Sequence, residues 1–139
     1  MSAIPGALDS LVSLFDAALS IKVSDGPTIV DFEQDGLAVG WMPEQIAVSS
    51  TERDSSLGDR GESFDVRNFL WARTGDTDVK PVRDRLFGYI DQVNATLRAN
   101  KRLGGAVTRA TLTVNDFGQG QTTDGAWATA MLTIHCDAL

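Results

Sequence analysis

The feature that most constrains the fold of this chain is a long amphipathic segment between residues 78 and 101. Its apolar residues recur at steps of three and four, which places them on one stripe of a helix. The stripe consists of Val79, Val82, Leu86, Ile90, Val93 and Leu97. Polar and charged residues fill the positions between them, so the opposite face meets water or a polar partner. The pattern predicts a helix over 78–101 with one buried side.

Both ends of this predicted helix carry sequence signals. Asp76 and Asp78 place negative charge near the positive end of the helix dipole, and Pro81 falls where a missing N–H removes little. Candidate N-terminal caps are Thr74, Asp76 and Thr77. After the helix, Gly104 and Gly105 permit a left-handed termination.

Alternating apolar and polar residues predict strands on both sides of the helix. Strands are expected over 64–73, 106–114 and 126–137, with shorter ones over 21–23 and 36–42. Residues 4–19 show a second helical stripe. We expect an α+β fold: a single domain over 1–139, with a mostly antiparallel sheet of four to five strands packed against a long amphipathic helix, plus an N-terminal helix.

Two polar segments are expected to be loops. Residues 49–62 contain a single aliphatic side chain, which predicts a mobile loop or arm that is functional, disordered alone, or both. Residues 115–125 hold three glycines among polar side chains, which predicts a wet loop joining two antiparallel strands.

Charge is unevenly distributed along the chain. The net charge is −7, but residues 1–65 hold 12 acids and 3 bases whereas residues 66–139 hold 7 acids and 9 bases. An acidic total argues against general binding of duplex DNA. Opposed patches would suit head-to-tail contacts between copies, although two ordinary solvated faces explain the charge equally well.

Motifs of catalysis and metal binding are weak in this sequence. Asp116–Gly118 spells a kinase metal-binding triplet without the other kinase signatures. Asp76 and Asp78 are explained by helix capping, and His135 is the only histidine. Cys136 is the only cysteine, which excludes an internal disulfide and is read as a small buried hydrophobe. We expect that the protein is not an enzyme and that it binds neither a metal nor a cofactor.

The order of features resembles one family of viral assembly proteins. A strand runs into a Gly-Asp-Thr-Asp helix start, the helix ends near Leu-Gly-Gly, and an Asp/Gln-rich segment precedes an alternating final strand. These features are Gly75–Asp78, Leu103–Gly105, Asp116–Asp124 and Ala126–Asp137, with Val23–Pro27 similar in the first half. The run from Phe69 to Leu139 resembles the C-terminal half of the tail terminator (tail completion, minor tail) proteins of long-tailed bacteriophages.

The resemblance implies a structural role in the virion. Such proteins form a ring, typically of six copies, which caps the head-proximal end of the tail tube and stops its polymerisation. The implied partners are further copies of the chain, the major tail tube protein and the head-tail connector protein, with genome DNA passing through the ring lumen. No membrane and no sequence-specific nucleic acid are expected, and the protein would be made in the host cytoplasm. The resemblance is weakest over residues 44–61, so no family property is assigned to them.

Two hypotheses assign contact residues within this resemblance. In the first, basic residues of the long helix meet acids of a neighbouring copy; the residues are Arg83, Arg85, Arg98, Arg102, Asp31, Glu33 and Asp35. In the second, the two polar segments contact the tube or the neck; the residues are Arg53, Asp54, Asp59, Arg60, Asp116, Gln119, Gln121 and Asp124.

Two other interpretations stay open from the sequence. A neck adaptor or another head-tail joining ring protein would share the small size and a similar fold. A small α+β enzyme or ligand-binding domain would instead hold a pocket between helix and sheet, lined by Trp41, Trp71 and Trp127. Three tryptophans in a chain of this length are more often core or interface residues.

Overall fold

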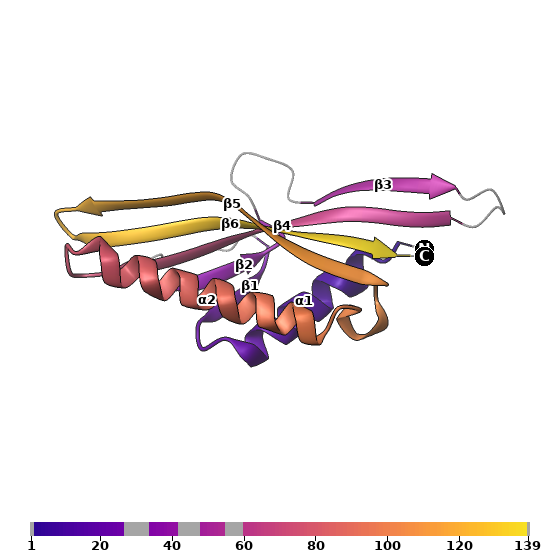
Figure 1. Cartoon of the computed structure of the whole chain (residues 1–139), viewed down its shortest axis with the longest axis horizontal. Coiled ribbons are helices and arrows are strands. Elements are labelled where there is room, and N and C mark those ends of the chain that lie inside the picture. Colours follow the sequence, from indigo (N-terminus) through magenta and orange to yellow (C-terminus); the bar gives the residue numbers. More distant parts are fainter. Residues whose placement is uncertain (1, 27–33, 42–47, 55–59, 139) are drawn as a thin grey trace.

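The computed structural model describes residues 2–26, 34–41, 48–54 and 60–138, and of residues 48–54, 60 and 61 the backbone alone (Figure 1). Its elements in chain order are α1 (Ile4–Ala18), β1 (Lys22–Asp25), β2 (Gly36–Val39), β3 (Val48–Asp54), β4 (Arg60–Thr74), α2 (Val79–Ala99), a 3-10 turn (Leu103–Gly105), β5 (Arg109–Thr122) and β6 (Gly125–Ala138).

The architecture has two layers: one sheet, and the helices α1 and α2 on one of its faces (Figure 1). Five strands follow the order β1-β2-β4-β6-β5, and β3 pairs with β4 beside β2. Among the described strands only β1 and β2 run parallel; the other pairs are antiparallel. The predicted α+β fold, with a mostly antiparallel sheet, a long helix and an N-terminal helix, is confirmed.

The long helix follows its sequence pattern closely. The buried residues of α2 are Val82, Leu86, Ile90, Val93 and Leu97, as the stripe predicts. The N-cap is Asp78, whose carboxylate accepts a hydrogen bond from the N–H of Lys80 at 3.1 Å, which confirms the explanation of Asp78 by helix capping. The candidate caps Thr74, Asp76 and Thr77 are wrong.

The end of α2 also differs from the prediction. The helix stops at Ala99 with Asn100 as its cap, and Gly104 and Gly105 lie in the turn that follows. Both glycines have the predicted positive φ, 70° and 96°, but they reverse the chain into β5 and do not cap α2 itself.

The core lies between the helices and the sheet. Ala126, Ala128 and Ala130 of β6 are almost wholly buried on the helix side. Short side chains at these positions let a helix approach the sheet backbone closely. Phe15 of α1 and Leu86 of α2 are fully buried in the same core cluster.

The polar segment 49–62 is largely strand, so its prediction as a loop is wrong. Residues 48–54 pair with residues 60–66 of β4 in an antiparallel register; residues 55–59, between the two strands, lie outside the described part. An edge strand is held by backbone hydrogen bonds to its neighbour and does not need buried side chains on either face. Apolar alternation, the signal used for the other strands, is consequently absent here.

The segment 115–125 is also strand, so its prediction as a loop is wrong. β5 runs to Thr122 and β6 starts at Gly125, which leaves a two-residue turn, and a bulge interrupts the pairing between Asn115 and Gly118. Gly120 is needed for packing because a Cβ there would lie 2.6 Å from the indole of Trp127 on the neighbouring strand. Gly120 thus makes room for a side chain of the neighbouring strand.

We refer to Ala126, Ala128 and Ala130 as the alanine row, and a larger side chain in this row should strain the contact between helix and sheet. We expect Ala128→Leu to lower the free energy of unfolding by about 1–3 kcal/mol, because a fully buried site must accept three more carbon atoms. Denaturant unfolding measures this change. Ala95→Leu, on the exposed side of α2, is the control and should unfold near the wild-type midpoint; equal effects of the two variants would contradict the close packing.

Candidate functional site

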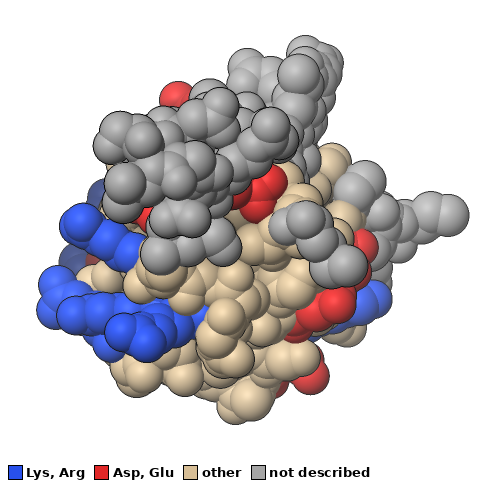
Figure 2. Space-filling model, turned by 90° about the vertical axis from the view of Figure 1, so that its right-hand side faces the viewer, with Lys and Arg blue, Asp and Glu red and all other residues tan. Residues whose placement is uncertain are grey.

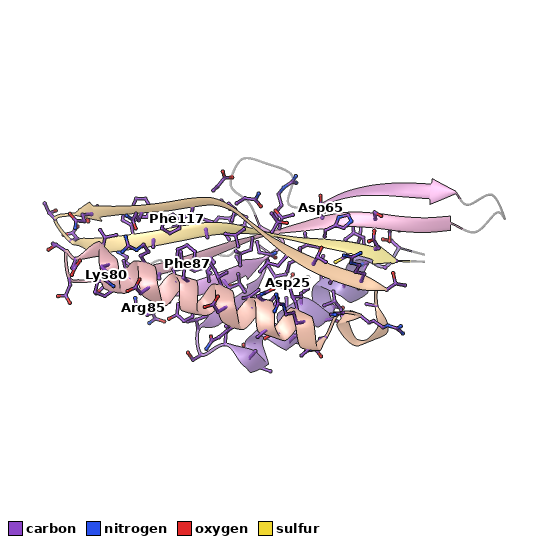
Figure 3. All side chains as sticks on the ribbon, viewed as in Figure 1. Asp25, Asp65, Lys80, Arg85, Phe87 and Phe117 are labelled. Carbon is purple, nitrogen blue, oxygen red and sulfur yellow. The ribbon has the colours of Figure 1, made fainter. Side chains whose placement is uncertain are left out.

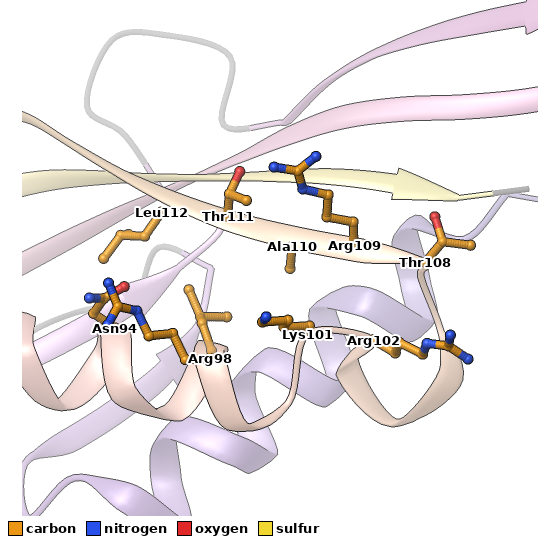
Figure 4. Close-up of a pocket in the computed structure, with 10 residues that line it drawn as sticks. Asn94, Arg98, Lys101, Arg102, Thr108, Arg109, Ala110, Thr111 and Leu112 are labelled. Carbon is orange, nitrogen blue, oxygen red and sulfur yellow. The ribbon is translucent and has the colours of Figure 1, made fainter.

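The largest hollow that we describe is an open groove between the C-terminal half of α2 and the start of β5 (Figure 4). Its volume is about 910 Å³. The residues that line it are Asn94, Leu97, Arg98, Lys101, Arg102, Thr108, Arg109, Ala110, Thr111 and Leu112. We refer to it as the basic groove.

Strand alternation decides which side chains enter the groove. Ala110 and Leu112 of β5 point toward the helix, whereas Arg109 and Thr111 point to the other side of the strand (Figure 4). Leu97 and Ala110 are buried and Leu112 partly so. The groove therefore has an apolar floor.

The rim of the groove is positively charged. Arg98, Lys101 and Arg102 are exposed, and none of them forms an ion pair with a described residue. Arg109 also borders the groove where β5 begins, although its side chain points away from the helix. At this end of the molecule most of the visible Lys and Arg atoms gather on one side, and several acids lie on the other (Figure 2). Clustered cations create a local potential that attracts anionic groups.

The strand beside the groove has an unpaired edge. β5 pairs with β6 on one side, and no described strand pairs with its other side. Such an edge presents a row of N–H and C=O groups that can bind a further strand. Thr111, Thr113 and Asn115 on this strand are exposed.

An apolar patch lies in the other half of the same strand and helix. The ring centroids of Phe87 on α2 and Phe117 on β5 are 5.2 Å apart, with the ring planes tilted by 44°, and both residues are labelled in Figure 3. Their exposed fractions are 41% and 40%, and Val114 on β5 is equally exposed. Phenylalanines are seldom left this open at the surface of a protein.

Two of the predicted interface residues contact each other within one chain. Arg85 donates from Nε to the carboxylate of Asp35 at 2.7 Å and also reaches the carbonyl of Arg73 at 2.6 Å. The prediction that Arg85 pairs with Asp35 of a neighbouring copy is therefore corrected: Arg85 pairs with Asp35 of its own chain, whose carboxylate already accepts hydrogen bonds there. Arg83 lies 3.9 Å from Asp84, and Arg98 and Arg102 line the basic groove. Asp31 and Glu33 lie outside the described residues.

Asp35 joins three elements at the start of β2. Its carboxylate accepts hydrogen bonds from the side chain of Arg85, from the hydroxyl of Tyr89 at 2.6 Å and from the N–H of Arg73 at 2.9 Å. Burial, together with the hydrogen bond to this carboxylate, raises the pKa of Tyr89 to about 12. This contact ties α2 to β2 and β4.

The residues predicted for tube or neck contact lie on strands and turns. Arg53 and Asp54 end β3, Arg60 begins β4, and Asp59 lies outside the described part. The four others belong to the hairpin of β5 and β6: Asp116, Gln119 and Gln121 lie on β5, and Asp124 lies in the turn. The amide of Gln121 donates to the carbonyl of Thr77, so this side chain fixes the hairpin to the start of α2.

The sheet face away from the helices carries a polar cluster around His135. Nδ1 of His135 lies 2.6 Å from a carboxylate oxygen of Asp65, and Nε2 lies 3.3 Å from Asp137. Ser63 donates to Asp137 at 2.7 Å. The hydrogen bond to Asp65 raises the pKa of His135 above its ordinary value, with burial acting in the opposite direction.

The tryptophans lie on this same outer face. Trp71 and Trp127 line a shallow hollow with Phe69, and Phe69 also contacts the ring of Trp41 at 5.1 Å. The register places Trp71 opposite Thr129 and Arg73 opposite Trp127, on the side away from α2. The predicted placement of these side chains between helix and sheet is wrong for Trp71 and Trp127.

Cys136 agrees with its interpretation as a core residue. It is fully buried beneath the helices, and burial raises the pKa of its thiol to about 12. A thiol with this pKa is almost wholly protonated at neutral pH, so it reacts slowly.

Comparisons with known proteins leave the family open. No known family matches the sequence, and no curated protein matches it either. Within the described residues, no helix combines the length and apolarity required to cross a bilayer, and no three acidic, histidine or cysteine side chains converge as metal ligands would.

Sequence reasoning identified the cations of the groove but missed its strand edge and its apolar end. Arg98 and Arg102 stood out as charges on a helix face. Phe117 was hidden in a segment expected to be a loop, and its partner Phe87 belongs to no stripe. Residues 111–114 alternate Thr with Leu and Val, and residues 118–121 alternate Gly with Gln. This alternation was the available signal for a longer strand.

Removing the carboxylate of Asp35 should destabilise the chain. We expect Asp35→Ala to lower the free energy of unfolding by about 2 kcal/mol, since charge-assisted hydrogen bonds at a site only 13% exposed are lost. The same change should lower the pKa of Tyr89, which ultraviolet titration measures. Asp84→Ala removes a carboxylate from an exposed ion pair on α2 and serves as the control, with little expected change. Equal losses in both variants would contradict the structural role of Asp35.

The His135 cluster should make stability depend on pH. Because the pKa is raised in the folded state, protonated His135 stabilises the fold fully below its unfolded pKa of about 6.5, and this contribution disappears as pH rises through the folded pKa. We expect Asp65→Asn to lower the pKa of His135 in an NMR titration and to flatten the pH dependence of unfolding between pH 6 and 9. Asp124→Asn, in the distant turn, should leave both unchanged; an unaltered titration in Asp65→Asn would refute the assignment.

Proposed function

We propose that this chain is a structural assembly protein that forms a ring and caps the head-proximal end of a phage tail tube. In this role it binds further copies of itself around the ring, the tube protein on one side and the head connector on the other. The sequence resemblance in its order of features supports this role.

The observation that carries the proposal is the basic groove beside an unpaired strand edge. Its cations have no described acidic partner within the chain, whereas the first 65 residues hold a net charge of −9. One part of the chain thus carries a positively charged surface, and another part carries an excess of negative charge. This distribution suits a contact in which two different surfaces of neighbouring copies meet. Contacts of that heterologous kind build rings when the rotation closes.

Two further surfaces could bind other partners. The outer face of the sheet carries the aromatic residues and the His135 cluster, and no described helix lies over it. The hairpin of β3 and β4 projects beyond the end of β6 (Figure 1). A cap between a tube and a neck needs two such surfaces besides the contact between copies.

Charge reversal in the groove tests the proposal on growing tail tubes. By negative-stain microscopy, we expect the wild-type protein to place a disc at one end of each tube and to give tubes of uniform length. Arg98→Glu combined with Arg102→Glu should abolish the discs, because the groove then repels its acidic partner. In wild type, disc formation should weaken as salt concentration rises.

The matched control reverses two charges at the other end of the same helix. Lys80→Glu with Arg83→Glu changes the net charge equally and should leave capping intact; loss of capping there would instead place Arg83 in the interface. Discs that form normally with the reversed groove would overturn the role of the groove, and wild-type protein that never marks a tube end would overturn the proposed function.

A further inference from the structure

We propose that β3 of a second copy pairs with the free edge of β5, so that the sheet continues from one copy to the next beside the basic groove. The inference rests on the self-assembly contained in the proposed function, but not on the identity of the tube. It names the partner of the groove: the edge strand Val48–Asp54 of another copy.

Strand direction permits this pairing. β4 is antiparallel to both β3 and β6, and β6 is antiparallel to β5, so β5 and β3 run in opposite directions within one chain. When copies repeat side by side with the same orientation, β3 of the next copy meets β5 as an antiparallel neighbour. Antiparallel addition is the commoner way for an edge to be extended.

The registers place β3 at the height of the groove. Ser49 is opposite Asp65, Asp65 opposite His135, and His135 opposite Thr111. Residues 48–51 of β3 therefore share rows with residues 109–112, where β5 begins, and residues 52–54 lie in rows just beyond the first residue of β5. In the strand order β1 lies one strand beyond the line that β2 and β3 share, so β1 of the added copy would come onto the line of β5 itself, level with residues 114–118. We therefore confine the pairing to the part of β5 before the bulge, and the contact requires the two copies to diverge from the bulge onward.

The faces also match in charge. Ser50 is opposite Phe64, which is buried in the core with the helices, so Ser50, Glu52 and Asp54 occupy positions on the helix side of the sheet. In a continuous sheet this is the side on which Arg98, Lys101 and Arg102 border the groove of the next copy. Two acidic positions would then face three cations that have no described partner of their own.

A cysteine pair tests the contact and its register. Ser49→Cys and Thr111→Cys occupy one row on the outer face, and within a chain their Cα atoms are three strand spacings apart, about 14 Å. A disulfide needs less than about 7 Å, so a bond between these positions must join two copies. The native Cys136 is buried and protonated, and can stay in place.

We expect mild oxidation of the purified double variant, at high concentration or on tail tubes, to give a ladder of linked copies on a non-reducing gel. The control pairs Ser49→Cys with Gln119→Cys, at the far end of β5, and should stay monomeric on the gel. Assemblies that form without the ladder would overturn the inference, as would a chain that stays monomeric under both conditions. A ladder from protein that fails to cap tubes would support the inference while rejecting the proposed function.

Charge exchange supplies a second readout. Light scattering should show that Arg98→Glu with Arg102→Glu weakens association by at least tenfold, and that adding Glu52→Lys and Asp54→Lys to the same chain restores it. Failure of the restoring pair would show that the groove meets another surface. If the groove instead bound duplex DNA in a salt-dependent way and the DNA displaced the second copy, the occupant would be nucleic acid and the inference would fall.

Discussion

The packing of the α2 stripe against the alanine row of β6 determines which surfaces of this molecule remain open. The helix covers one face of the sheet, and its close approach to β6 leaves its C-terminal half beside β5. The apolar stripe covers only one side of α2. The charged residues at the C-terminal end of α2 therefore lie outside the core, along the edge of β5. The groove is thus a direct consequence of how the core is packed: Leu97 and Ala110 form its floor, and Arg98 and Arg102 form its rim.

The second constraint is the hydrogen-bonded cluster at Asp35. A carboxylate with three donors around it joins β2, β4 and α2, and it uses Arg85 from the same row of basic residues that otherwise faces solvent. The cations of α2 and of the turn after it therefore have two different roles. Arg85 is bound within the fold, while Arg98, Lys101 and Arg102 keep their charge available. Sequence position alone does not separate these roles, since all four residues are exposed on α2 or directly after it.

The elements predicted from periodicity are those whose side chains are buried. Val82 to Leu97 form a stripe and Ala126 to Cys136 alternate because one side of each element enters the core. β3 and the far half of β5 are held instead by backbone pairing and by a cross-strand indole, which leave little trace in the pattern of apolar residues. The same reasoning explains the site: its charges could be read from the sequence, but the strand edge beside them could not.

An open edge on each side of a twisted sheet is a hazard unless something limits what can pair with it. β5 has a bulge that bends the strand, and the groove beside its first half carries cations that repel another strand of the same charge. β3 has acidic positions on the matching face and few apolar residues that would favour non-specific pairing. An edge that accepts only a strand of opposite charge, and only in the antiparallel direction, would add every further copy in the same orientation. Whether such addition ends in a closed ring or an open filament depends on the rotation between copies, which the twist of the sheet and the bulge set together.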